Sequence, residues 1–296
     1  MKRNGTPNGP IEHGFPHLDT VRAAITALHR RLTTDGIRAY DTAFAPGDAA
    51  FGPDEDLHLG AHRVASAMVR ALRLPDARVL VSFRPMEQAA TVELTDGPAY
   101  FVEVADRFRT HRGDLAAALS HEVAHVLLHR LDLRFATTAD NEILTDTAAA
   151  YLGAGWLLLD AYRQDALTHQ KFGYLTPEEF GYVLAKRGRL IGEDLSAWFT
   201  SPRAYEAYVR GGALDARDHR RAPLAAAGPA ERLRYARARR SGAAAERGAG
   251  YRFEGHGAER RVSFPCPVCA QRLRLPVRGP LRARCALCGT VLECAT

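Results

Sequence analysis

Lysine is nearly absent from this chain. Only Lys2, Lys171 and Lys186 are lysines among its 40 basic residues, so the other 37 are arginines, and the formal net charge is +6. A basic surface of this kind attracts nucleic acid or acidic partners. Arginine combined with abundant alanine also results from coding bias, which is the plainer interpretation of the composition alone. Composition therefore does not define a partner.

Cysteine is absent from the first 265 of the 296 residues, because all five cysteines fall between 266 and 296. A secreted disulfide scaffold would spread its cysteines through the chain. Long apolar runs are missing as well, since none approaches the roughly 20 residues needed to cross a bilayer. The first seven residues run into glycine and proline without an apolar targeting segment. We therefore expect a cytoplasmic protein with no membrane partner.

A His-Glu-x-x-His pattern is the main chemical motif of the chain. His121 and His125 lie four residues apart in a predicted helix that begins near Gly113-Asp114. Residues at this spacing share one helix face, so both imidazoles can bind the same metal ion. Glu122 lies about 100° around the helix, where it can take a proton from a metal-bound water. Patterns this short also arise by chance.

A second predicted helix follows, with Thr138 or Asp140 as its N-cap. Its residues Glu142 and Asp146 are again four apart and share a face. A catalytic zinc needs three protein ligands and one open position, so Glu142 is the natural third ligand. Asp146 can accept a hydrogen bond from the second nitrogen of a ligating histidine. Acidic residues also favour a helix N-terminus, but that explains their presence and not their spacing.

Together the two patterns resemble the gluzincin zinc metallopeptidases, of which thermolysin is the best known. The resemblance covers about residues 113 to 160 and rests on two motifs, His121-Glu122-x-x-His125 and Asn141-Glu142-x-x-x-Asp146. It implies a zinc held by the two histidines and by a glutamate of the second helix. It also implies an aspartate behind the ligands and a glutamate that acts as the general base.

The resemblance also implies a group that stabilises the oxyanion, usually a tyrosine or a histidine. Tyr151, His169 and Tyr174 are the candidates, and the sequence does not choose among them. In these enzymes the edge strand of a small sheet holds the peptide substrate extended. Three predicted strands, 78–83, 90–94 and 100–104, precede the motif helix and suggest a small, largely antiparallel sheet.

The last 36 residues contain two Cys-x-x-Cys knuckles separated by fifteen residues. Four thiolates at this spacing complete a closed, tetrahedral zinc shell. The pattern resembles a zinc ribbon with short strands at 272–277 and 281–284, and with Cys294 left as a free thiol. We therefore predict a structural zinc bound by four residues: Cys266, Cys269, Cys285 and Cys288.

The predicted organisation is α+β. It comprises a flexible arm (1–16), a mainly helical zincin-like domain with a small antiparallel sheet (17–211), an Ala/Arg/Gly-rich linker (212–260) and the ribbon (261–296). Within the first domain, the second metal helix is expected to continue to Tyr162, and a further helix to begin at the Thr176 capping box. Two more helices are expected near 192–199 and 202–210. Within the linker, Ala230 to Arg240 can form a basic helix.

The sequence thus predicts a zinc metallopeptidase with one catalytic and one structural zinc, acting on a peptide or protein substrate. The alternative is a non-catalytic regulatory or binding protein that keeps the same fold. In that case the ribbon and the arginine-rich segment would hold nucleic acid or a partner protein. Glu122 favours catalysis, because a purely structural zinc needs no base.

Overall fold

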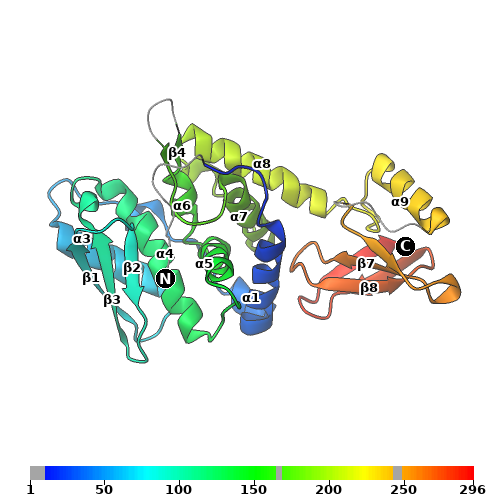
Figure 1. The fold of residues 1–296 in the computed structure, drawn as a ribbon, viewed down its shortest axis with the longest axis horizontal. Helices are drawn as coiled ribbons and strands as arrows, with labels where there is room; N and C mark the ends of the chain where they lie inside the picture. Colours follow the sequence, from blue (N-terminus) through cyan, green and yellow to red (C-terminus); the bar gives the residue numbers. More distant parts are fainter. Residues whose placement is uncertain (1–10, 165–168, 243–248) are drawn as a thin grey trace.

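The structure is a computed structural model that describes residues 11–164, 169–242 and 249–296, and it is drawn in Figure 1. Its class is α+β, as the sequence predicts. A large front part ends in the long helix α8, and a smaller C-terminal module lies beyond that helix (Figure 1). The front part contains the following elements: α1 Leu18–Arg38, α2 Pro46–Ala49, α3 Leu57–Ala71, β1 Arg78–Arg84, β2 Ala90–Glu93, β3 Ala99–Ala105, α4 Leu115–Arg130, α5 Thr138–Leu152, α6 Trp156–Asp160, β4 Arg163–Gln164, β5 His169–Gln170, α7 Pro177–Ile191 and α8 Pro202–Asp218.

The front sheet has the order β1-β3-β2, so β3 is central and β2 is an edge strand. The antiparallel pairing expected from the sequence is present between β2 and β3, while β1 and β3 run parallel. Strands β2 and β3 form a hairpin and are therefore antiparallel. Strand β3 enters the sheet between β2 and the earlier strand β1, and it runs in the same direction as β1. Alternate residues of β1 and β3 are buried. That face contributes to the single core of the front part, to which α3 and α4 also belong.

Two helix predictions in the front part need correction. Helix α5 ends at Leu152 instead of continuing to Tyr162, because Gly153 adopts a left-handed conformation (φ 105°) and the short helix α6 follows. The predicted helix 192–199 is only a 3₁₀ turn, Ser196–Trp198. The capping box at Thr176 is present as expected, and α8 extends well past the predicted end at residue 210.

The C-terminal module is larger than the predicted ribbon. Its described residues form one helix and five strands: α9 Pro229–Ser241, β6 Arg252–Glu254, β7 Arg261–Pro265, β8 Arg272–Pro276, β9 Pro280–Arg284 and β10 Val291–Ala295. Helix α9 matches the expected basic helix. The rest of 212–260 is not simply a linker, because α8 runs to Asp218 and β6 pairs with β7. Aromatic side chains explain this, since Tyr235 and Tyr251 are buried in a second core with Phe264 and the cysteines.

The predicted arm 1–16 is described only from residue 11. In that part His13 and Gly14 lie against Glu178 of α7, with Gly14 N donating to Glu178 Oε2 at 3.2 Å. Residues 1–10 lie outside the described range. Among the described helices none combines the length and the apolar character needed to cross a membrane.

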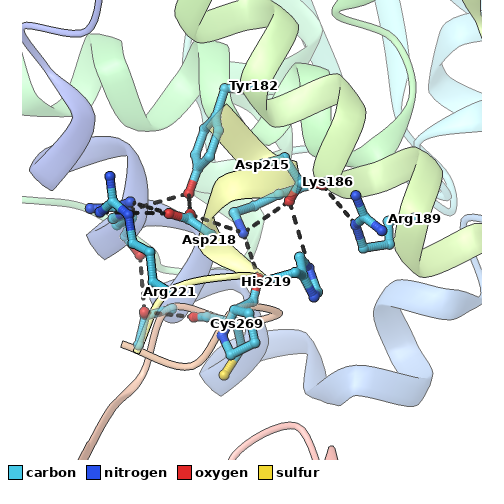
Figure 2. Close-up of polar contacts among 11 residues, drawn as sticks. Tyr182, Lys186, Arg189, Asp215, Asp218, His219, Arg221 and Cys269 are labelled. Carbon is cyan, nitrogen blue, oxygen red and sulfur yellow. Dashed lines mark hydrogen bonds and ion pairs between the residues drawn. The ribbon is translucent and has the colours of Figure 1, made fainter. Parts of the chain in front are cut away.

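A buried charged cluster joins the two parts of the molecule, as Figure 2 shows. Lys186 of α7 is buried, and its Nζ donates to Asp215 Oδ1 at 3.3 Å and to the Pro267 carbonyl at 2.5 Å. Thr26 Oγ1 of α1 donates to the Cys269 carbonyl at 2.8 Å. Burial alone would lower the pKa of Lys186, but Tyr182, Asp218 and Asp215 outweigh it and raise the pKa. The first cysteine knuckle is therefore docked on the front part through its backbone carbonyls.

Candidate metal centres

Helix α4 brings His121 and His125 together. The helix is buried almost all round, and its only residues that are not buried are the two histidines and the final His129-Arg130. The two Nε2 atoms lie 3.1 Å apart, and the rings meet edge to face. Apart from its C-terminal end, α4 is therefore open to solvent only at the two imidazoles.

Helix α5 completes the site with Glu142. Its Oε2 lies 3.1 Å from His121 Nε2 and 3.4 Å from His125 Nε2. Ligands about 2.05 Å from a tetrahedral zinc are separated by about 3.3 Å, so the three atoms already have the spacing of a metal-bound set. Burial alone would raise the pKa of Glu142, but the hydrogen bonds to His121 and His125 lower it to about 2. The three atoms thus present an anionic donor set that fits a divalent metal ion.

Asp146 fixes the orientation of His121. Its Oδ1 lies 2.8 Å from His121 Nδ1, and its side chain is fully buried. Since a carboxylate only accepts, Nδ1 donates to Asp146, and Nε2, which faces Glu142, is the nitrogen that a metal would take after its proton is released. Burial lowers the pKa of His121, but the hydrogen bonds to Asp146 and Glu142 and the charges of Asp146 and Glu122 together outweigh it, so the pKa is raised well above its ordinary value. The structure therefore brings Asp146 and His121 together, as the sequence groups them.

A loop before α7 holds the other oxygen of Asp146, which sequence reasoning missed. The backbone N–H of Leu175 donates to Asp146 Oδ2 at 3.0 Å, and that of Tyr174 donates to the same oxygen. Gly173 permits this approach, because its φ is +74° and a Cβ there would lie 2.5 Å from Asp146 Oδ2. The aspartate is consequently held in place by donors from two sides.

Thr145 contacts His125 as Asp146 contacts His121, and the sequence motifs did not predict this contact. Its hydroxyl donates to the Asn141 carbonyl at 2.9 Å, and its Oγ1 lies 3.2 Å from His125 Nδ1. Because the one hydroxyl proton of Thr145 is already used, its Oγ1 accepts from His125 Nδ1–H. This leaves Nε2 of His125 as the nitrogen that can offer its lone pair to a metal. The available signal was its position three residues after Glu142, which puts both on one face of the helix.

Glu122 is buried beside the cluster. Burial raises the pKa of its carboxyl and the Glu142 charge adds to this effect, whereas His121, His125 and a backbone hydrogen bond from Val92 oppose it. Val92 belongs to the edge strand β2, which contacts α4. The free edge of the sheet therefore runs past the candidate base.

The three candidates for oxyanion stabilisation have different locations. The Tyr174 ring stacks on His121, with centroids 6.1 Å apart, and burial together with Glu142, Asp146 and Glu122 raises its pKa to about 12. The structure does not bring Tyr151 to the site, because its buried hydroxyl lies 3.1 Å from His29 Nε2 on α1. The side chain of His169 lies outside the described residues. Tyr174 is thus the candidate that the structure places beside the metal ligands.

The four predicted cysteines form a second centre in the C-terminal module. All four are buried, with Cys266 Sγ 3.7 Å from Cys288 Sγ and Cys269 Sγ 3.6 Å from Cys285 Sγ. Thiolates about 2.3 Å from a tetrahedral zinc lie about 3.8 Å apart, so this spacing also fits a metal ion. The fifth cysteine, Cys294, lies on β10 outside the cluster. The cluster is thus positioned for a zinc ribbon.

The two knuckles have the same backbone turn. Ala270 and Gly289 each follow a Cys-x-x-Cys pair and both have a left-handed conformation, with φ of 58° and 73°. In each turn the residue after the pair donates its N–H to the carbonyl of the first cysteine. The two halves of the centre are therefore built alike.

Comparisons with protein-family models, curated protein sequences and solved structures found no match to this chain. The function proposed below therefore rests on the site itself: two clusters in the described residues whose ligand atoms converge as a metal requires.

Proposed function

We propose that this chain is a zinc-dependent peptidase with a structural zinc in its C-terminal module. The observation that carries the proposal is the convergence of His121 Nε2, His125 Nε2 and Glu142 Oε2 within 3.4 Å of one another, next to a buried glutamate. Two histidines and one carboxylate leave one position of a tetrahedral zinc open, as catalytic zinc sites do. A zinc held there would acidify a water and polarise a peptide carbonyl.

Glu122 is the proposed general base. A base works best when its pKa lies near the working pH, and burial moves the pKa of Glu122 upward in that direction. It would accept a proton from the attacking water and then deliver that proton to the leaving amine. Asp146 and Thr145 would keep both imidazoles oriented throughout, and the Tyr174 hydroxyl would donate to the oxygen that becomes negative.

The substrate class follows from the neighbouring sheet. In the described part of the chain, strand β2 has no partner strand on its outer side, and Val92 at this edge interacts with Glu122. An extended peptide could add to β2 as a further strand and so lie across the base. Backbone pairing of this kind supports a peptide substrate with modest side-chain selectivity. We place the activity in a reducing compartment such as the cytoplasm, because the four clustered cysteines must stay unoxidised to bind the proposed structural zinc.

The test is Glu122→Gln in the full chain loaded with zinc. Peptide hydrolysis should fall by about 10²- to 10⁴-fold while the zinc content stays unchanged, because the base is lost but no ligand is. His121→Ala is the companion variant and should lose both the front zinc and the activity. Full activity in Glu122→Gln would disprove the mechanism. A zinc-loaded chain that cleaves no peptide would support the non-catalytic alternative.

A further inference from the structure

Charge is divided very unevenly along this chain. Residues 229–296 contain fourteen arginines against five glutamates and no lysine or aspartate, a net charge of +9. The preceding 228 residues contain 26 basic and 29 acidic residues, a net charge of −3. All of the excess positive charge therefore belongs to the C-terminal module. Coding bias toward arginine does not by itself explain this division, because it would act on the whole chain.

One face of the three-stranded sheet in this module is lined with arginine. In the antiparallel register Arg252 of β6 lies opposite Ser263 of β7, which lies opposite Arg274 of β8. Residues two apart on a strand share a face, so Arg261 and Arg272 belong to the same side. All four arginines are exposed. We call this surface the arginine face, defined by Arg252, Arg261, Arg272 and Arg274.

Two acidic residues partly offset the arginine face: Glu254 within the sheet, and Asp19 of α1, whose charge acts on Arg272. Glu254, the only acidic residue of these three strands, accepts from Arg274 at 3.1 Å in a pair that is largely exposed. Exposed pairs of this kind are weak and easily exchanged for another anion. Arg272 donates to the buried Ser263 hydroxyl at 3.0 Å, which uses only one of its five N–H groups. The face therefore keeps most of its donors directed to solvent.

The opposite face of the same sheet is covered from within the module. Tyr235 of α9 packs against Tyr251 and Phe253, with ring centroids 4.8 and 5.4 Å apart. The large apolar side chains exposed among the described residues of the module are Leu233 on α9 and Val291 on β10, and neither belongs to the arginine face. A protein partner usually needs an apolar or aromatic anchor at the centre of its interface. The arginine face offers only charge and hydrogen-bond donors.

We propose that the arginine face binds the phosphate backbone of nucleic acid. A guanidinium binds phosphate through two parallel N–H groups, which lysine cannot do. Arg272 and Arg274 are spaced about 7 Å apart along one strand, and Arg252 lies about 10 Å from Arg274 across two strand spacings. Such a flat array neutralises successive phosphates without reading bases, so binding is independent of sequence and depends on salt. This binding does not depend on the peptidase activity proposed above.

The experiment measures binding of the full, zinc-loaded chain to a labelled DNA duplex of about 20 base pairs as salt rises from about 50 to 200 mM. The test variant is Arg252→Gln with Arg261→Gln. The control variant is Arg234→Gln with Arg237→Gln, which removes the same charge from α9 on the opposite side of the sheet. Zinc content and the thermal transition confirm that both variants are folded.

The expected result is salt-dependent binding that the test variant weakens at least about tenfold near 0.1 M salt, with a salt slope smaller by about 1.8 for two lost phosphate contacts. The control variant should lose less than about threefold, because only its long-range attraction falls. Equal loss in both variants, or no binding by the unchanged chain, would overturn the proposal. Competition by polyglutamate as effective as that by DNA would also overturn it and would indicate an acidic protein partner.

Discussion

The two candidate metal centres in the described residues differ in how many ligands the protein supplies and in how deeply they are buried. The front centre has three donor atoms, on α4 and α5, and its imidazoles are partly exposed. The C-terminal centre has four cysteine sulfurs and is buried throughout. A metal with three protein ligands keeps a position for water, whereas a metal with four is closed to substrate. Under the function proposed above, the same ion would act on a substrate in one centre and only hold the chain together in the other.

The supports around the two centres differ as well. The front ligands are backed by side chains and by a loop, with Asp146 behind His121 and Thr145 behind His125. The cysteines rely instead on two backbone turns of the same kind, at Ala270 and Gly289. Helices already packed in a core can hold the front ligands before metal arrives. Short strands cannot, so we expect the C-terminal module to depend more on its metal.

The largest effect should come from removing one cysteine of the C-terminal centre. Cys288→Ser removes one of four thiolates and should cost the module its zinc and most of its folding free energy, since structural zinc contributes about 10–16 kcal/mol in small domains. Bound zinc should fall to one ion per chain, and amide hydrogen exchange should rise across β6 to β10. Cys294→Ser is the matched control, because this buried cysteine lies outside the cluster. Two bound zinc ions in Cys288→Ser would contradict the expectation that the C-terminal centre needs all four cysteines to hold its zinc.

A smaller effect is expected when a residue that hydrogen-bonds to a histidine of the front centre is changed. In Asp146→Asn the amide cannot accept from His121, Tyr174 and Leu175 together, so His121 loses its fixed orientation. Zinc affinity of the front centre should fall about 10- to 100-fold, measured by competition with a chelator. The fall should be smaller in Thr145→Val, which removes a neutral acceptor instead of a charged one. Unchanged affinity in Asp146→Asn would show that the helices alone position His121.

The smallest effect should come from the loop that clamps Asp146. Gly173→Ala places a methyl group 2.5 Å from Asp146 Oδ2 at a φ of +74°. Gly192→Ala is the control, with a similar φ of +86° and nothing within 4 Å of its Cβ. Gly192→Ala should lose about 1–2 kcal/mol of stability from the left-handed backbone, and Gly173→Ala should lose more because of the overlap with Asp146, as measured by denaturant unfolding. Only Gly173→Ala should also weaken zinc binding. An equal loss of affinity in both variants would show that the contact between this loop and Asp146 does not contribute to zinc binding.

The sequence was most informative where a pattern lies within one element. The four-residue spacing of His121 and His125, and of Glu142 and Asp146, sets side chains on one helix face whatever surrounds the helix. The Cys-x-x-Cys spacing likewise defines a knuckle locally. For these residues the structure brings together the side chains that the sequence groups, including Asp146 beside His121.

Features that depend on contacts between distant segments could not be predicted. The clamp on Asp146 comes from residues 173–175, and the partner of Tyr151 is His29, 122 positions away. The addition of β6 and α9 to the ribbon depends on Tyr235 and Tyr251 packing together, although the segment looks like a linker in composition. Helix α5 was predicted too long, because a glycine in a helical pattern can be either an interior residue or a left-handed end.

The docking of Lys186 limits how freely the two parts can be separated or exchanged. Its ammonium group is enclosed by Asp215 and Asp218 of α8 and by the Pro267 carbonyl of the first knuckle. A fragment cut at residue 211 would remove both carboxylates and the carbonyl, and would leave a buried cation without its partners. The front part therefore extends at least to Asp218. A foreign zinc module grafted after that residue would replace this ribbon fully only if it also presented a carbonyl to Lys186.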